Sequence, residues 1–430
     1  MKRVLVLCAG CLFTAGLFLA SAQAGEVDIL VEKLVKKGIL TKQDAAEIMK
    51  DVKEEAAQEK DAERQELIRS TKEAVREDIK KDPKVFAEVL PQWIRKMQLK
   101  GDLRLRYQYT DRDEKAERNQ GRYRLRLGVV TQLNDTVDVG FGVASGDSNP
   151  RSTNEDMNNT FERGDLRLDY AYARYKPYSW MSLVGGKFAN PLFLTTDMLW
   201  DSDIRPEGAS VLFNHSVYDW LDVFATTGFW VVDERKDDEN DPTMYVVQPG
   251  TKIKLGKYVY FKNAVTYYQF DNVKNTTLDY TSKSNTLRKF ENTLKYDYDV
   301  LALTGELGWK TPYARMPFAA LFGEAVKNTS AGQGDTGYAA GFGIGSGKVK
   351  KRHDWQFVAR YMKLERDAWV DALTDADNYD GETNIKGYKF ALTYGLFENI
   401  DFAMACFLHE RISGESLDEK KLQLDLNFRF

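Results

Sequence analysis

The feature that most restricts the fold is an alternation of apolar and polar residues that begins near Met97 and recurs up to the C-terminus. Between positions 99 and 109 the odd positions hold leucines and tyrosines, apart from one glycine, and the even positions hold charged or amide residues. Side chains point alternately to the two faces of a β-strand, so such a segment has one apolar and one polar face. The pattern returns at 123–133, 388–396, 400–408 and 422–430. A length of about ten residues is typical of strands in a transmembrane barrel.

The connections between these segments alternate in length. Short connections lie at 134–136, 177–179, 218–220, 255–257 and 398–399. Long polar connections lie at 145–164, 189–208, 233–243, 271–286, 327–336, 365–384 and 411–420. Outer-membrane barrels have short periplasmic turns and long external loops, so residues 97–430 are predicted to form an all-β, transmembrane antiparallel β-barrel of about sixteen strands. Fourteen or eighteen strands are the alternatives, because the alternation changes parity near Asp299, where either a bulge or a misplaced strand start is expected.

The first 24 residues have the pattern of a secretory signal peptide. Two basic residues precede an apolar run at 4–20, and Ala22-Gln23-Ala24 is a small-residue cleavage motif. Export with cleavage after Ala24 is therefore predicted, and an uncleaved anchor or a lipidated cysteine is the alternative. Cleavage would leave Cys406 as the only cysteine, so no internal disulfide is expected.

Residues 25–96 are rich in Lys, Glu and Ala and almost free of Gly. This composition predicts a separate α-helical segment on the periplasmic side. A break is expected at Lys37-Gly38, followed by a capping box in which Thr41 is the N-cap and Asp44 is the acid three residues later. Charged residues interrupt the heptad-like stripe that follows, so a weak coiled coil and a solvated monomeric helix are both consistent with the sequence.

Aromatic residues gather near the short connections. They are Tyr175, Tyr178, Trp180, Tyr218, Trp220, Tyr258, Tyr260, Trp309, Tyr313, Trp355 and Phe397. Amphipathic rings suit the headgroup layer of a membrane, so this placement predicts an interfacial girdle. The alternative is the general preference of aromatic residues for strands.

Composition and motifs argue against several other functions. The 65 acidic and 61 basic residues nearly balance, whereas a nucleic-acid-binding domain carries a basic excess. His215, His353 and His409 are isolated in the sequence and lack the ligand spacing of a metal site. No GxSxG, HExxH or phosphate-binding glycine loop occurs. We therefore expect no cofactor and no enzymatic activity, and a hydrolase assembled from distant strands is the alternative.

Several short stretches carry a resemblance to a known family: Gly186-Lys187-Phe188, Asn190-Pro191, Asp201-Ser202-Asp203, Glu207-Gly208, Asp354-Trp355-Gln356 and Asn384-Ile385-Lys386-Gly387. They resemble the putative porin family of Gram-negative bacteria, whose members have a helical prefix and a sixteen-stranded barrel. The resemblance implies an outer-membrane location, contact with membrane lipid, and passive diffusion of small hydrophilic solutes or ions through a water-filled pore. The terminal Phe430 is similar to the signal that the outer-membrane assembly machinery recognises. A homotrimer, as in the general porins, is one oligomeric state consistent with this family.

Two functions of other classes are alternatives to a porin. One is a structural outer-membrane protein whose helical prefix tethers the membrane to the cell wall. The other is a soluble secreted β-domain such as a lectin.

Charged residues on the polar faces suggest where selectivity would arise. Five arginines share the inward parity on adjacent strands and are predicted to form a pore-lining basic wall: Arg104, Arg106, Arg122, Arg124 and Arg126. In the alternative interpretation, loop carboxylates neutralise them. The long connection after the fifth strand carries Asp197, Asp201, Asp203 and Glu207. In general porins the loop at this position folds inward, so the resemblance implies a constriction loop that faces the basic wall and orients dipolar solutes.

Overall fold

The structure is a computed structural model that describes residues 31, 33–41, 43–45, 50, 65–66, 69–70, 73, 91–236 and 240–430. It contains two compact units, Met1–Pro91 and Gln92–Phe430. In the described part of the chain, no helix has the length and apolar character needed to cross a membrane. The predicted signal peptide and most of the predicted heptad stripe lie outside the described residues.

The described residues of the first unit are helical on both sides of a turn at Lys37 and Gly38. Gly38 has a φ of 72°, a left-handed conformation that glycine adopts at little cost. The second helix begins with a reciprocal pair of hydrogen bonds. The backbone N–H of Asp44 donates to Thr41 Oγ1, and the backbone N–H of Thr41 donates to Asp44 Oδ2, both at 3.2 Å. The predicted helix break and capping box are therefore confirmed.

Seventeen antiparallel strands form one sheet in the described part of the second unit. Their bounds are β1 (Gln98–Arg112), β2 (Arg118–Gln132), β3 (Val137–Ser145), β4 (Glu155–Asp156), β5 (Leu166–Tyr178), β6 (Met181–Lys187), β7 (Glu207–Tyr218), β8 (Leu221–Val231), β9 (Thr243–Lys254), β10 (Val259–Asp271), β11 (Asp299–Lys310), β12 (Phe318–Asn328), β13 (Thr336–Gly345), β14 (Trp355–Leu364), β15 (Ile385–Phe397), β16 (Ile400–Arg411) and β17 (Asp418–Arg429). A short helix, α4 (Gln92–Arg95), precedes β1, and a 3₁₀ turn, η1 (Tyr379–Gly381), precedes β15. Because β4 has only two residues, sixteen strands make the wall.

The sheet closes on itself, because β1 pairs with both β2 and β17. Closure pairs each of the sixteen wall strands on both sides, so the wall has no open edge. β11 begins at Asp299, and its pairings with β10 and β12 contain no register shift. The parity change there is therefore a misplaced strand start and not a bulge. The closed sixteen-stranded barrel predicted from the alternation is confirmed.

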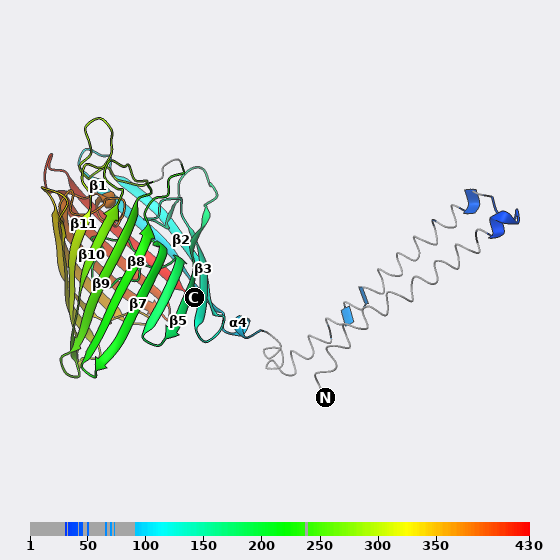
Figure 1. Cartoon of the computed structure of the whole chain (residues 1–430), viewed down its shortest axis with the longest axis horizontal. Coiled ribbons are helices and arrows are strands. Elements are labelled where there is room, and N and C mark those ends of the chain that lie inside the picture. The colour runs from blue at the N-terminus through cyan, green and yellow to red at the C-terminus, as the bar shows by residue number, and fades with distance from the viewer. Residues whose placement is uncertain are drawn as a thin grey trace. The chain divides into compact units, whose positions relative to one another are not determined.

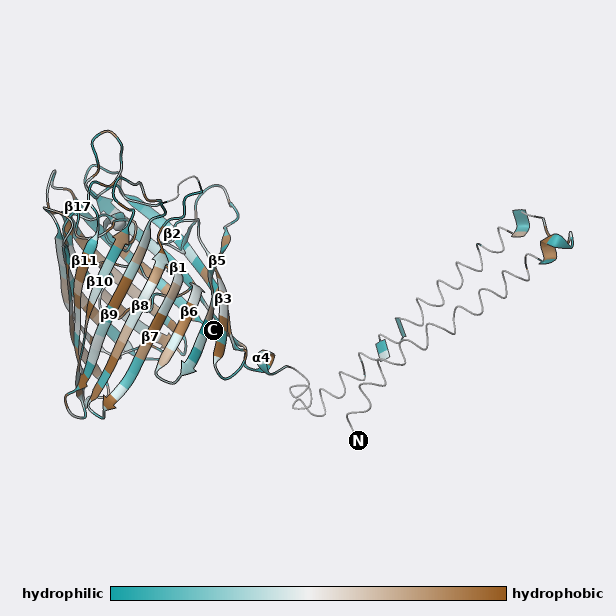
Figure 2. Ribbon diagram, viewed as in Figure 1, coloured by the Kyte–Doolittle hydropathy of each residue, from teal (hydrophilic) through white to brown (hydrophobic). Residues whose placement is uncertain are grey.

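Apolar and polar residues alternate along the strands (Figure 2). On β1, Leu105 and Tyr107 are exposed on the outer face, whereas Arg106 and Gln108 are buried. Many aromatic side chains near the short connections are also exposed, and two pairs stack, Tyr178 with Trp180 and Tyr218 with Trp220. These positions agree with an interfacial girdle.

Tyr260 is an exception to the girdle. It has the parity of the buried Ala264 on β10, and its hydroxyl donates to Glu306 Oε1 at 2.6 Å. Its ring lies over Gly308 of β11, where an added Cβ would clash with it. Tyr260 therefore belongs to the polar interior, and its assignment to the girdle is wrong.

Long loops lie at one end of the barrel and short turns at the other (Figure 1). We number the loops of the long-loop end in chain order, and four of them matter here: loop 2 (146–165), loop 3 (188–206), loop 5 (272–298) and loop 7 (365–384). Loop 5 is longer than the predicted 271–286, because β11 starts late.

Loops 3, 5 and 7 pack into the barrel and form an apolar core with the inner faces of β6 and β8–β15. Trp200 of loop 3 contacts Trp230 of β8 and Trp369 of loop 7, each at 5.7 Å between ring centroids. Trp369 also packs on Tyr268 and Phe270 of β10, at 4.8 and 5.5 Å. This core fills one side of the lumen and leaves space on the side of β1, β2 and β15–β17.

Candidate functional site

The open side of the lumen is a polar cavity of about 920 Å³. We call it the main cavity. Residues of β1, β2, β15, β16 and β17 and of loops 2, 3 and 7 line it. Its basic groups come mostly from strands, and its carboxylates, apart from Asp425 on β17, come from the loops. Charges of opposite sign therefore line the same cavity.

Four of the five predicted wall residues line the main cavity: Arg104, Arg106, Arg122 and Arg124. The register of β1 and β2 places them opposite one another in two pairs. Arg126 is the next inward residue of β2, and its guanidinium bridges Asp102 at 2.8 Å and Asp203 at 3.3 Å. The arginines thus occupy one row of the inner wall, because they share a parity on adjacent strands.

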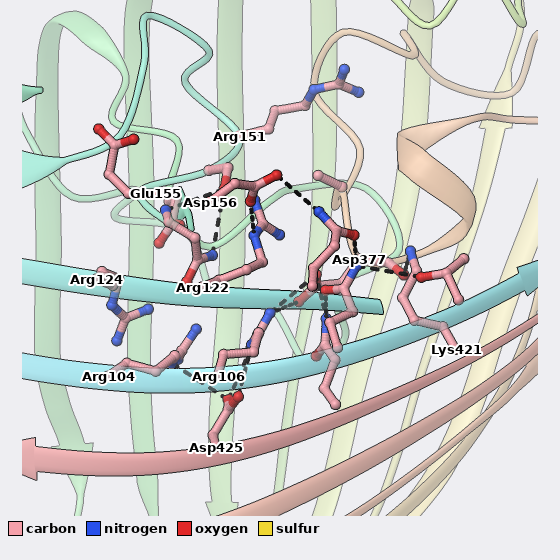
Figure 3. Close-up of a pocket in the computed structure, with 18 of the residues that line it drawn as sticks. Arg104, Arg106, Arg122, Arg124, Arg151, Glu155, Asp156, Asp377, Lys421 and Asp425 are labelled. Atoms are coloured by element: carbon pink, nitrogen blue, oxygen red, sulfur yellow. Dashed lines mark hydrogen bonds and ion pairs between the residues drawn. The ribbon is translucent and has the colours of Figure 1, made fainter. Parts of the chain in front are cut away.

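Arg106 lies between two carboxylates (Figure 3). Its Nε and Nη2 donate to Asp425 at 2.7 and 2.9 Å, a two-pronged geometry that is among the stronger ion pairs. Its Nη1 lies 3.3 Å from Asp377 of loop 7. Arg104 shares the first partner, with its Nε 3.4 Å from Asp425.

The arginines of β2 are paired as well. Arg122 donates to Asp156, on β4 within loop 2, at 2.5 Å. Arg124 donates to Asp102, on β1, at 2.6 Å. Carboxylates from loops 2, 3 and 7 and from β1 and β17 therefore balance the row of arginines.

Loop 3 crosses the lumen from β6 along the inside of the wall. The backbone N–H of Phe193 donates to Gln248 Oε1 of β9 at 2.7 Å, and Thr196 Oγ1 donates to Glu324 of β12 at 2.5 Å. Asp197 then reaches β14 and β15, and Asp203 reaches Arg126 of β2. These anchors hold the loop across the barrel at several points around its circumference.

The four predicted constriction residues occupy different environments. Asp197, Asp201 and Asp203 line the main cavity. Glu207 does not, because it is the first residue of β7, is exposed, and pairs with Lys187 at 2.7 Å. Glu207 lines neither of the cavities described here, so the prediction for this residue needs correction.

Asp201 joins loop 3 to loop 7. The backbone N–H groups of Asp203 and Ala376 donate to its two oxygens at 2.8 and 2.9 Å. Burial, together with the nearby Asp375 and Asp203, raises the pKa of Asp201 well above its usual range. Burial, with Asp377 next to it, likewise raises the pKa of Asp375.

Asp377 behaves in the opposite way. Burial alone would raise its pKa, but Arg106, Lys421 and Lys389 outweigh this effect and hold the pKa of Asp377 below its ordinary value. Loop 7 therefore presents one firmly ionised carboxylate to the arginine row.

The sequence did not single out Arg360, Lys389, Asp377 or Lys421. Arg360 and Lys389 are opposite one another on β14 and β15, and both pair with Asp197. Their inward parity and the density of aspartates in 371–380 were visible signals. The ion pairs that these residues form could not be read from the sequence, because they depend on how loops 3 and 7 fold into the barrel.

Comparison with known proteins identifies the type of barrel. A family model described as "Putative porin" matches residues 109–302 and 285–430. OprB of Pseudomonas putida is similar in structure, with a TM-score of 0.51, 10% identity, and coverage of 78% of this chain and 94% of that chain. A porin mutant of Rhodopseudomonas blastica (TM-score 0.45, 10% identity, 78% and 100% covered) and the channel DcaP of Acinetobacter baumannii (0.45, 13%, 78% and 97%) are further matches. No curated protein sequence matches.

Proposed function

Since this chain belongs to the putative porin family and is a passive channel of the outer membrane, we propose that small hydrophilic solutes cross it through the main cavity. A barrel of sixteen strands is wide enough for an aqueous channel. In this protein the apolar core of loops 3, 5 and 7 occupies one side, so the path is displaced toward β1, β2 and β15–β17.

The position of loop 3 carries the proposal. Asp197 and Asp203 stand at the edge of the main cavity, and the arginine row stands on its wall. Opposite charges across a narrow passage create a transverse field, which orients dipolar solutes and disfavours apolar ones. We propose that the arginine row is the basic wall, and that Asp197, Asp201 and Asp203 form the constriction.

Reversal potentials across a salt gradient in planar bilayers test this proposal. Asp197→Asn with Asp203→Asn should shift selectivity toward anions, and replacement of the five arginines by glutamine should shift it toward cations. Glu207→Gln is the matched control, because Glu207 lines neither cavity, and it should leave selectivity unchanged. Both shifts should shrink as the Debye length falls from about 10 Å at 0.1 M salt to about 3 Å at 1 M. An unchanged reversal potential in the double aspartate variant would contradict the constriction.

The proposal also includes export, the helical segment and the assembly of the barrel. We expect residues 1–24 to be removed on export and residues 25–96 to form a periplasmic helical segment. Phe430 extends the β1–β17 seam, because its backbone exchanges hydrogen bonds with Gly101 at 2.7 and 3.0 Å. Its ring covers Gly101, where an added Cβ would clash with it. Recognition of Phe430 by the assembly machinery and the homotrimer both stay predictions.

A further inference from the structure

A second cavity, of about 440 Å³, adjoins the main cavity at loop 3, and we call it the side cavity. Four residues line both cavities: Asp197, Asp201, Ser202 and Lys389. The two spaces therefore meet where Asp197 pairs with Lys389 at 2.6 Å. A solute that leaves the main cavity at this point encounters the side cavity next.

Part of the side cavity is apolar. Leu194 of loop 3, Phe322 of β12 and Val358 of β14 line it. The Phe322 ring lies over Gly341 of β13, where an added Cβ would come within 2.7 Å of it. Gly341 is also the register partner of Arg360, so this ring lies next to the strand that carries the guanidinium. The apolar surface therefore adjoins the cationic one.

Two cationic side chains meet at one ion-paired carboxylate at the junction. Arg360 and Lys389 both pair with Asp197, which is the only carboxylate that forms an ion pair with either of them among the described residues. Arg360 is 4% exposed, and its Nη2 donates to Asn378 Oδ1 at 2.9 Å. Its Nε has no hydrogen-bond partner within the described part of the chain. Buried polar groups normally have partners, but this Nε is itself buried, so Arg360 adds positive charge behind the cavity surface and Lys389, which lines both cavities, is the group that can donate to a solute.

From these observations we propose that the junction binds small carboxylates that have an apolar body. The solute carboxylate accepts from Lys389, lies next to the Arg360 guanidinium, and competes with Asp197 for these cations. The apolar body lies against Phe322, Val358 and Leu194. A pocket with one apolar surface and a few convergent polar groups is the usual form of a small-molecule site. The inference rests on the proposed channel function and names a solute class for it.

Block of chloride current through the full-length chain in planar bilayers tests the site. The probes are benzoate, acetate, which lacks the apolar body, and benzylammonium, which has the ring but the opposite charge. Benzoate should halve the current at a concentration roughly tenfold lower than acetate, because its ring is removed from water. Benzylammonium should not block at comparable concentrations.

Variants separate the two halves of the site. Lys389→Met should raise the half-blocking concentration of benzoate about tenfold, the scale of one lost charge-assisted hydrogen bond. Asp197→Asn should lower it, because the internal competitor is neutralised. Phe322→Ala should raise it for benzoate and leave acetate unchanged, a difference that a general folding defect would not produce. Lys254→Met is the matched control, because Lys254 pairs with Asp222 at 3.2 Å and lines neither cavity.

The outcomes distinguish this inference from the proposed function. Equal block by benzoate and acetate, or a benzoate block that Lys389→Met leaves unchanged, would overturn the site while the channel itself stands. A chain that inserts into bilayers and carries no current would instead overturn the proposed path.

Discussion

Replacement of Asp371 should loosen the loops that fill one side of the barrel. The Asp371 side chain in loop 7 is fully buried and accepts hydrogen bonds from loop 5. The donors are Thr281 Oγ1, Ser282 Oγ, the N–H and Oγ of Ser284, and the N–H of Asn285, at distances from 2.5 to 3.2 Å. One carboxylate therefore holds a whole segment of loop 5 against loop 7.

Asp371→Ala leaves the backbone N–H groups of Ser284 and Asn285 without acceptors. Each unpaired buried donor costs about 1–3 kcal/mol, so the free energy of opening this contact should fall by about 2–6 kcal/mol. Since each 1.4 kcal/mol is a factor of ten, amide exchange in loop 5 should become roughly 30-fold to 20,000-fold faster. Asp371→Asn keeps one oxygen and should show a smaller increase.

Hydrogen exchange read by mass spectrometry in detergent micelles measures this effect. The control is Asp165→Ala, which removes an exposed pair with Arg167 and should leave loop 5 exchange unchanged. Single-channel recordings of Asp371→Ala should also become noisier, because loops 5 and 7 hold part of the apolar core beside the conducting path. Exchange in loop 5 that matches the parent protein would refute the clamp.

Three further predictions follow from the barrel and its loops. The folded chain should resist SDS until it is heated and then shift in gel mobility, since a closed sheet has no edge from which to unravel; identical migration before and after heating would contradict closure. Leu392→Arg, on the outer face, should lower the free energy of unfolding by about 2–4 kcal/mol, measured by urea unfolding from lipid vesicles. Thr393→Arg, in the main cavity, should lower it much less. Equal losses of stability would mean that the two faces are misassigned. Burial raises the pKa of Asp201 well above its ordinary 3.8. The contact between loops 3 and 7 should therefore be most stable below pH 3.8, and it should weaken as the pH rises through the raised pKa. Asp201→Asn should remove this part of the pH dependence, which thermal unfolding at a series of pH values measures.

The wall of the barrel could be predicted from the sequence because apolar and polar residues alternate within each strand. The prediction of the strand before Lys310 was wrong in its start, because apolar residues of loop 5 resemble a strand in the sequence. Leu294 and Tyr298 of loop 5 are buried in the core of the lumen, and Leu287 forms an isolated β-bridge with Leu294. A loop that folds into a barrel has an apolar face of its own, so its hydropathy resembles that of the wall.

The arginine row was predictable for the same local reason, since parity on adjacent strands fixes which side chains share a face. Its partners were not predictable, because they lie far away along the chain. Arg106 and Asp377 are 271 residues apart, and their contact requires loop 7 to turn into the lumen. The density of aspartates in loop 7 was therefore visible in the sequence, but the basic residues that they contact were not.

Loop 3 couples the apolar and polar sides of the lumen through a short stretch of sequence. Met198, Leu199 and Trp200 are buried in the apolar core, and Asp197 and Asp201 flank them. The apolar residues anchor the backbone, and this anchoring fixes where the flanking carboxylates stand in the main cavity. A change in the core, such as Trp200→Ala, should therefore alter ion selectivity without removing a charge. A variant that keeps the parental reversal potential while its loop 3 amides exchange faster would show that the carboxylates are held by their ion pairs alone.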